Sequence, residues 1–221
     1  TLTQEEFLSF WSDCHSGNAG AVEEKFKTFK KHPEKLKTAL TTPSKPQQGY
    51  YPLYYAASFG MNEMAQKILT AAKNYPKTFA TVLKQTNEDG LSALHRAANL
   101  GKEGVVKKIL NAAKKNPQLL GEILTQKNNH GFSPFHEAVM QGREEIVKDM
   151  LAAVRDYPEI LTTILTQPDG AGLLPLYVAA NLGKNNIATE ILKAAQQDIG
   201  LFRNLIKRHP NEQLDLLHCL L

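Results

Sequence analysis

Residues 90–101 read GLSALHRAANLG, in which a histidine and an arginine lie among small residues and a glycine stands at each end. Three other segments share this pattern: GYYPLYYAASFG (49–60), GFSPFHEAVMQG (131–142) and GLLPLYVAANLG (172–183). The four segments begin 41 residues apart. The chain is therefore a tandem array, and each copy predicts one supersecondary unit that must pack on its neighbours.

The same spacing continues outside these segments, because Pro76, Pro117 and Pro158 are also 41 residues apart. Upstream the spacing is 43, since Gly17 precedes Gly60 and Pro33 precedes Pro76. We predict a degenerate capping repeat at the N-terminus, four full repeats and the start of a truncated one. Their bounds are 1–48, then 49–89, 90–130, 131–171 and 172–212, and finally 213–221.

Each unit is expected to form a helix, a turn and a second helix. Pro52, Pro134 and Pro175 suit the first turn of the first helix. The glycines at 60, 101, 142 and 183 are expected to end that helix in the left-handed conformation. A second helix is predicted within 102–116, where five apolar residues recur at helical spacing: Val105, Val106, Ile109, Leu110 and Ala113.

The segments SALHRA (92–97) and SPFHEA (133–138) resemble the T-P-L-H-x-A signature of the ankyrin repeat, and the resemblance extends over essentially the whole chain. It implies an all-α solenoid of stacked helix-turn-helix units. An ankyrin repeat usually has about 33 residues, so these units are longer by 8. In the segment 116–126, a proline followed by Leu120, Ile123 and Leu124 predicts an additional short helix in each repeat.

Long-repeat ankyrin arrays of this kind are similar to those in effector proteins that intracellular bacterial pathogens deliver into host cells. This resemblance implies a place in the host cytosol. Because the chain starts with Thr1, we expect it to be part of a longer protein.

Composition argues for a cytoplasmic protein. No stretch approaches the roughly 18 apolar residues of a membrane span, and no signal peptide precedes the repeats. The net charge of +4 comes from scattered lysines, so neither nucleic acid nor membrane is a predicted partner. Cys14 and Cys219 lie at opposite ends, and we expect two unpaired, at least partly buried thiols.

His95 is the first candidate for chemistry, but its equivalents argue for a structural role. His136 occupies the same position in the next repeat, whereas the repeats on either side carry Tyr54 and Tyr177. A serine lies three residues before each of the two histidines, at 92 and 133, and is absent where tyrosine replaces histidine. This pairing is typical of helix capping, so we interpret both histidines as part of the scaffold.

Other candidates for catalysis are weaker. Cys14 and His15 are adjacent and would point about 100° apart on a helix. The chain lacks zinc, calcium and phosphate-loop motifs, so we predict no catalytic residue, no metal, no cofactor and no enzymatic activity. One alternative stays open: a basic stripe for phosphate, lipid or nucleic acid, which helix-end lysines also explain. Its members would be Lys73, Lys114, Lys115, Arg155 and Lys193.

By resemblance to ankyrin arrays, the partner-binding surface is concave and consists of the turns before each first helix and the residues that end it. Mapped onto this sequence, the predicted protein-binding residues are Tyr50, Phe59, Leu91, Asn99, Leu100, His130, Phe132, Met140, Gln141, Leu173, Asn181 and Leu182. The apolar turn residues could instead pack between neighbouring turns. The leading hypothesis is a protein-protein interaction module, and the alternative is a substrate-recruiting domain of a larger enzyme.

Overall fold

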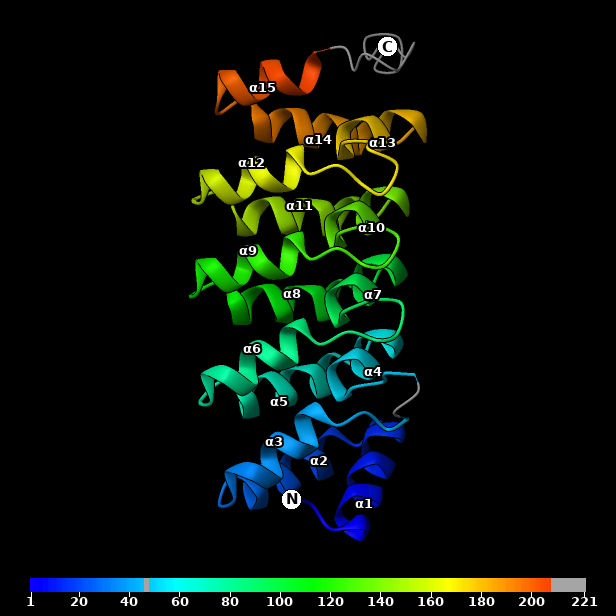
Figure 1. Ribbon diagram of the computed structural model, residues 1–221, viewed down its shortest axis with the longest axis vertical. Coiled ribbons are helices and arrows are strands. Elements are labelled where there is room, and N and C mark those ends of the chain that lie inside the picture. The colour runs from blue at the N-terminus through cyan, green and yellow to red at the C-terminus, as the bar shows by residue number, and fades with distance from the viewer. Residues whose placement is uncertain (46–47, 208–221) are drawn as a thin grey trace.

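The computed structural model describes residues 1–45 and 48–207, and in these residues the secondary structure is helical (Figure 1). An isolated antiparallel bridge joins Thr86 to Ser92. The predicted truncated repeat (213–221) and the last residues of the preceding one (208–212) lie outside the described residues, and so does Cys219. Among the described helices, none is both long and apolar enough to cross a membrane.

The helices of the described residues form five layers of three. The first layer holds α1 (Gln4–His15), α2 (Ala19–Phe29) and α3 (Pro33–Thr41). The next two hold α4 (Pro52–Phe59), α5 (Asn62–Ala72), α6 (Pro76–Lys84), α7 (Ala93–Leu100), α8 (Glu103–Ala113) and α9 (Pro117–Thr125). The last two hold α10 (Pro134–Met140), α11 (Glu144–Ala153), α12 (Pro158–Thr166), α13 (Pro175–Asn181), α14 (Asn185–Ala195) and α15 (Ile199–Ile206).

The predicted all-α solenoid with an extra helix in each unit is therefore confirmed. Pro52, Pro134 and Pro175 occupy the first turns of α4, α10 and α13 as expected, because proline lacks the N–H that would be unsatisfied there. The left-handed conformation predicted for the glycines after the first helices is confirmed, with φ values of 67°, 70°, 66° and 64° at positions 60, 101, 142 and 183.

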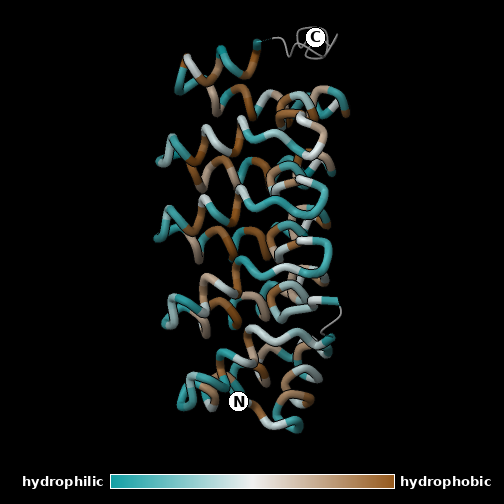
Figure 2. Tube along the Cα trace, in the orientation of Figure 1, coloured by the Kyte–Doolittle hydropathy of each residue, from teal (hydrophilic) through white to brown (hydrophobic). Residues whose placement is uncertain are grey.

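Equivalent helices stack on one another along the molecule (Figure 1). The first helices α4, α7, α10 and α13 form one column, the second helices form a central column, and the third helices α6, α9, α12 and α15 form the column on the opposite side. Apolar residues line the inside of this stack, and the turns are hydrophilic (Figure 2). All five apolar residues predicted for the second helix over 102–116 are buried, as are Leu120, Ile123 and Leu124 of α9.

A ladder of glutamines joins successive third helices. The side-chain amides of Gln85, Gln126 and Gln167 donate to the backbone carbonyls of Leu40, Lys84 and Thr125, at 3.2, 2.9 and 3.0 Å. Each acceptor belongs to the preceding layer and lies within one residue of the carboxyl end of its helix. Carbonyl groups at a helix end lack an intrahelical partner. The extra helix thereby links each layer to the one before it.

Candidate protein-binding surface

The turns before α7, α10 and α13 share one geometry. In the first, the Asn87 side-chain oxygen accepts from the backbone N–H groups of Asp89 (3.1 Å) and Leu91 (2.8 Å). Asn128 and Asp169 do the same in the next two turns. A glycine at φ 75° to 87° closes each turn. A short polar side chain that satisfies its own turn stabilises a tight loop. These residues recur at a spacing of 41 and were missed as a signal in the sequence.

The turns also stack on one another. The backbone N–H of Asn129 donates to the backbone carbonyl of Asp89 in the preceding turn (3.0 Å), and the side-chain amide of Asn129 donates to the backbone carbonyl of Glu88 (2.7 Å). A side chain on Gly131 would meet the backbone of Gly170 at 2.6 Å, so only glycine permits this approach. The turns before α7 and α10 are therefore joined by hydrogen bonds, and the turns before α10 and α13 are in close backbone contact.

The predicted capping pair is present where the first helices begin. The Ser92 hydroxyl lies 2.9 Å from Nδ1 of His95, and its oxygen accepts a hydrogen bond from the backbone N–H of His95. His136 is bound to Ser133 in the same way. Both histidines are buried, and burial lowers the pKa of each to about 4. A neutral, enclosed imidazole that caps a helix supports the scaffold role inferred from the sequence.

Tyrosine performs a related task in the layers without histidine. The Tyr54 hydroxyl accepts from the side-chain amide of Asn87, and the Tyr177 hydroxyl donates to the carbonyl of Lys207. Each bond leads from a first helix to a following segment of the chain. Tyr54 thereby ties its layer to the turn before α7, whereas Tyr177 binds the residue that follows α15 in its own layer.

Cys14 and His15 diverge as the helical geometry predicts. Cys14 is buried against the core of the first layer, and burial raises the pKa of its thiol to about 12. His15 is exposed, and its ring lies 4.9 Å from that of Tyr55. The thiol is held in its protonated form and lacks the thiolate character that a nucleophile needs.

The twelve predicted binding residues fall into two groups. Five are exposed, namely Phe59, His130, Gln141, Asn181 and Leu182. Seven are half-buried, namely Tyr50, Leu91, Asn99, Leu100, Phe132, Met140 and Leu173. Of the apolar turn residues, Tyr50, Leu91 and Leu173 pack against the core, which favours the alternative that they support the turns.

Phe59 belongs to an aromatic cluster that the sequence analysis missed. Trp11 and His15 of α1 lie beside Tyr55 of α4, with ring centroids 6.2 and 4.9 Å away, and Phe59 lies 4.7 Å from Tyr55 on the outer side. Phe59 remains 61% exposed. Its partners lie in two layers, so the signal is absent from the sequence of any one repeat.

A buried carboxylate organises the centre of the surface. Glu137 of α10 accepts from the amide of Asn99 at 2.8 Å and from the amide of Asn128 at 3.0 Å. Arg143 donates to the carbonyl of Asn99 from the other side (3.2 Å). Asn99, a predicted binding residue, is therefore held in one orientation by two neighbours from the next layer.

The comparison with known families agrees with this architecture. A model described as ankyrin repeats (3 copies) matches residues 21–119 and 53–157, which together make up more than half of the chain. The chain belongs to the ankyrin-repeat family. Ankyrin repeats are in general protein-protein interaction modules. A search of curated proteins found no match to this chain.

Proposed function

We propose that this chain is a non-enzymatic module that holds a segment of a partner protein against the turns and the ends of the first helices. One observation carries the proposal. Phe59 and Leu182 are 61% and 49% exposed, and they occupy equivalent positions at the ends of α4 and α13. Exposed large apolar side chains at matching places of a repeated scaffold are typical of interface anchors.

The surface around these anchors is preorganised. The turns, the caps and Asn99 are held by hydrogen bonds from their own layer or from the next one. A partner would therefore meet groups that lose little conformational entropy on binding, which favours affinity. Exposed His130 and Gln141 supply polar contacts between the two apolar ends.

We also propose that the module is one part of a larger effector-like protein that acts in the cytosol of a host cell. The resemblance of its long repeats to those of bacterial effectors supports this. The alternative is a module that recruits substrate for a catalytic domain elsewhere in such a protein. A catalytic motif in the complete reading frame would favour the alternative.

The test is affinity capture from host-cell lysate with matched surface variants. Phe59→Glu combined with Leu182→Glu places charge at both proposed anchors. Leu8→Glu combined with Ile206→Glu is the control, because these residues are also exposed (60% and 45%) and lie in α1 and α15, outside the predicted set.

We expect the control to retain the captured protein and the anchor variant to lose it. A protein captured equally well by both variants would contradict the proposal. Circular dichroism of both variants checks that the helices persist.

A further inference from the structure

A groove lies among the second and third helices, lined by residues of α5, α6, α8 and α9. The third helices form the column on the side opposite the turns (Figure 1). The groove has a volume of about 600 Å³ and lies between the layer of α5 and α6 and the layer of α8 and α9. Phe79 and Leu119 are among the apolar residues that line it, and Lys73, Lys84, Lys108 and Lys115 line it as well. We call it the basic groove.

The charge of the basic groove is largely uncompensated. Lys84 is paired with Glu122 at 2.6 Å, and Glu122 is the one carboxylate among the lining residues. Within residues 1–45 and 48–207, Lys73, Lys108 and Lys115 form no ion pair. Three free ammonium groups therefore lie around an apolar lining.

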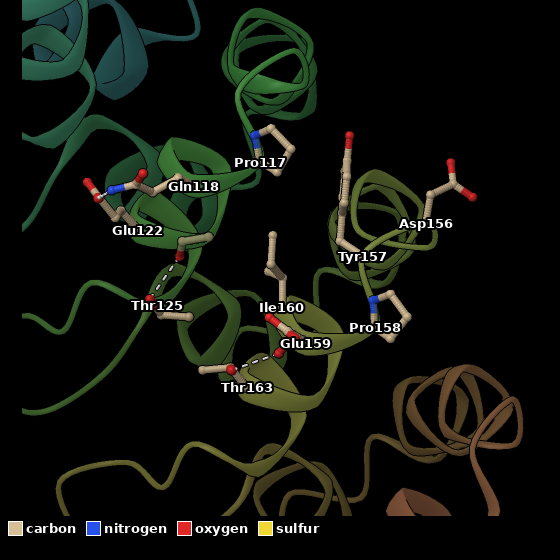
Figure 3. Close-up of a pocket in the computed structure, with 11 residues that line it drawn as sticks. Pro117, Gln118, Glu122, Thr125, Asp156, Tyr157, Pro158, Glu159, Ile160 and Thr163 are labelled. Atoms are coloured by element: carbon tan, nitrogen blue, oxygen red, sulfur yellow. Dashed lines mark hydrogen bonds between the residues drawn. The ribbon is translucent and has the colours of Figure 1, made fainter.

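The next pair of layers offers an internal comparison. A second groove of about 680 Å³ lies between α9 and α12, and Ile160 and Tyr157 line it (Figure 3). Its charged residues are Glu122, Asp156 and Glu159, without a cation. We call it the acidic groove. Glu122 lines both grooves and marks the border between them.

Two positions that carry lysine in the basic groove carry aspartate one repeat further on, and one of these aspartates, Asp156, lines the acidic groove. One repeat, or 41 residues, beyond Lys108 and Lys115 lie Asp149 and Asp156. The neutral Gln118 corresponds to the acidic Glu159, whereas the apolar Leu119 corresponds to the apolar Ile160. The fold requires the apolar positions in both places and is indifferent to the sign of the exposed charges. The reversal is therefore a property of the surface and not of the scaffold.

The residues of the basic stripe that the sequence left open as an alternative divide between two grooves in the structure. Lys73 and Lys115 both line the basic groove, whereas Arg155 and Lys193 line a smaller groove of about 370 Å³ beside α14. There Lys193 is already paired with Glu190 at 2.9 Å. Lys114 lines neither groove. A continuous cationic stripe is absent from the described residues, which argues against an extended polyanion as the ligand.

We propose that the basic groove is a second docking site, which binds an acidic segment of a partner protein whose apolar side chains enter the groove between the lysines. The unpaired lysines attract an acidic segment because the charges are complementary. The apolar lining residues can be buried by the apolar side chains of a peptide, whereas the backbone of a nucleic acid would leave them exposed. The acidic groove beyond Glu122 repels the same segment and limits it to the layers of α5 to α9. This site is independent of the surface formed by the turns.

The experiment uses the whole chain and a short fluorescent peptide in which glutamates alternate with leucines. Fluorescence anisotropy reports its binding. Two peptide controls replace the glutamates by glutamines or the leucines by serines. A single-stranded oligonucleotide and phosphatidylserine vesicles are tested beside them.

The matched variants change the same charge at different places. Lys108→Asp combined with Lys115→Asp introduces the residues found one repeat further on, Asp149 and Asp156, which the fold accepts there. Lys114→Asp makes the same change on a neighbouring exposed lysine outside the groove. Should the aspartate variant unfold, Lys108→Gln combined with Lys115→Gln removes the charge without reversing it.

We expect saturable binding of the acidic peptide that weakens as salt rises and falls about tenfold in the groove variant, since two exposed ion pairs are lost. Lys114→Asp should leave the affinity within about twofold, and both peptide controls should bind more weakly. Three results would overturn the proposal: no saturable binding, an equal effect of Lys114→Asp, or tighter binding of the oligonucleotide or the vesicles with the same dependence on Lys108 and Lys115.

Discussion

Nε2 of His95 lies 3.0 Å from the carbonyl oxygen of Phe132, which precedes the first helix of the next layer. Nδ1 of the same ring accepts from the backbone N–H of Ser92 at 3.2 Å, so Nε2 carries the proton and donates it to that carbonyl. One neutral imidazole therefore caps its own helix and holds the following turn. Protonation would destroy the cap, because Nδ1 would cease to be an acceptor.

This arrangement predicts a loss of stability in mild acid. The pKa of both His95 and His136 is about 4 in the folded chain, against about 6.5 when unfolded. The unfolded state therefore binds more protons between these values, so stability is complete above pH 6.5 and falls as the pH decreases to 4. Each histidine accounts for about 3 kcal/mol of this loss. Urea denaturation at a series of pH values measures it.

The chain supplies its own control for this prediction. Ser92→Leu with His95→Tyr, and Ser133→Leu with His136→Tyr, introduce the residues found at the equivalent positions Leu174 and Tyr177. The pH dependence between 6.5 and 5 should flatten in this variant, whatever its stability at neutral pH. An unchanged slope would show that other groups cause the acid sensitivity.

The stacked turns predict a difference between two glycines. Both Gly131 and Gly172 have positive φ, at 80° and 87°, but within the described part of the chain a new Cβ would meet a neighbouring backbone at Gly131 and not at Gly172. Gly172→Ala should cost about 1 kcal/mol from the left-handed conformation alone. Gly131→Ala should cost at least about 2 kcal/mol more, because the turns must separate. Equal losses in thermal unfolding would contradict the close stacking.

The buried carboxylate of Glu137 predicts sensitivity to a change of one atom. Glu137→Gln places an N–H₂ group opposite the amide donor of Asn99 or Asn128, and leaves a buried donor without an acceptor. We expect a loss of about 1–3 kcal/mol in the free energy of unfolding. Glu145→Gln, on the exposed side of α11, should change it by less than about 0.5 kcal/mol. A Glu137→Gln protein as stable as the parent would refute the hydrogen-bond network.

A comparison of Phe132 with Phe135 tests whether Phe132 binds the partner or belongs to the core. Its side chain is half-buried in the turn before α10, whereas Phe135 is fully buried within that helix. Phe132→Ala should weaken partner binding with little change in Tm, and Phe135→Ala should cost about 3–5 kcal/mol. If Phe132→Ala destabilised the chain as much, Phe132 would belong to the core.

The Cys14 thiol should resist alkylation in the folded chain. Its pKa of about 12 leaves almost no thiolate at pH 8, and the side chain is 1% exposed. Iodoacetamide followed by peptide mass spectrometry separates Cys14 from Cys219. We expect Cys14 to react only after denaturation; fast modification of the native chain would reopen the case for a nucleophile.

Much of this architecture was predictable from the sequence. The segments around Gly49, Gly90, Gly131 and Gly172 repeat the same local signals, which include a proline or serine at the helix start and a glycine after its end. Because these signals act within a few residues, their recurrence indicated the helices, the caps and the role of His95 without any knowledge of distant contacts. The apolar spacing in 116–126 predicted the third helix for the same reason.

What only the tertiary structure decided depends on contacts between layers. The exposure of Phe59 depends on its packing on Tyr55 and on α1, and the orientation of Asn99 depends on Glu137 and Arg143. The opposite charges of Lys115 and Asp156 are visible in the sequence, but their place in two separate grooves is not. Local patterns determine which helices form, whereas the stacking of layers decides which side chains meet water, because each surface is built from residues about 40 positions apart.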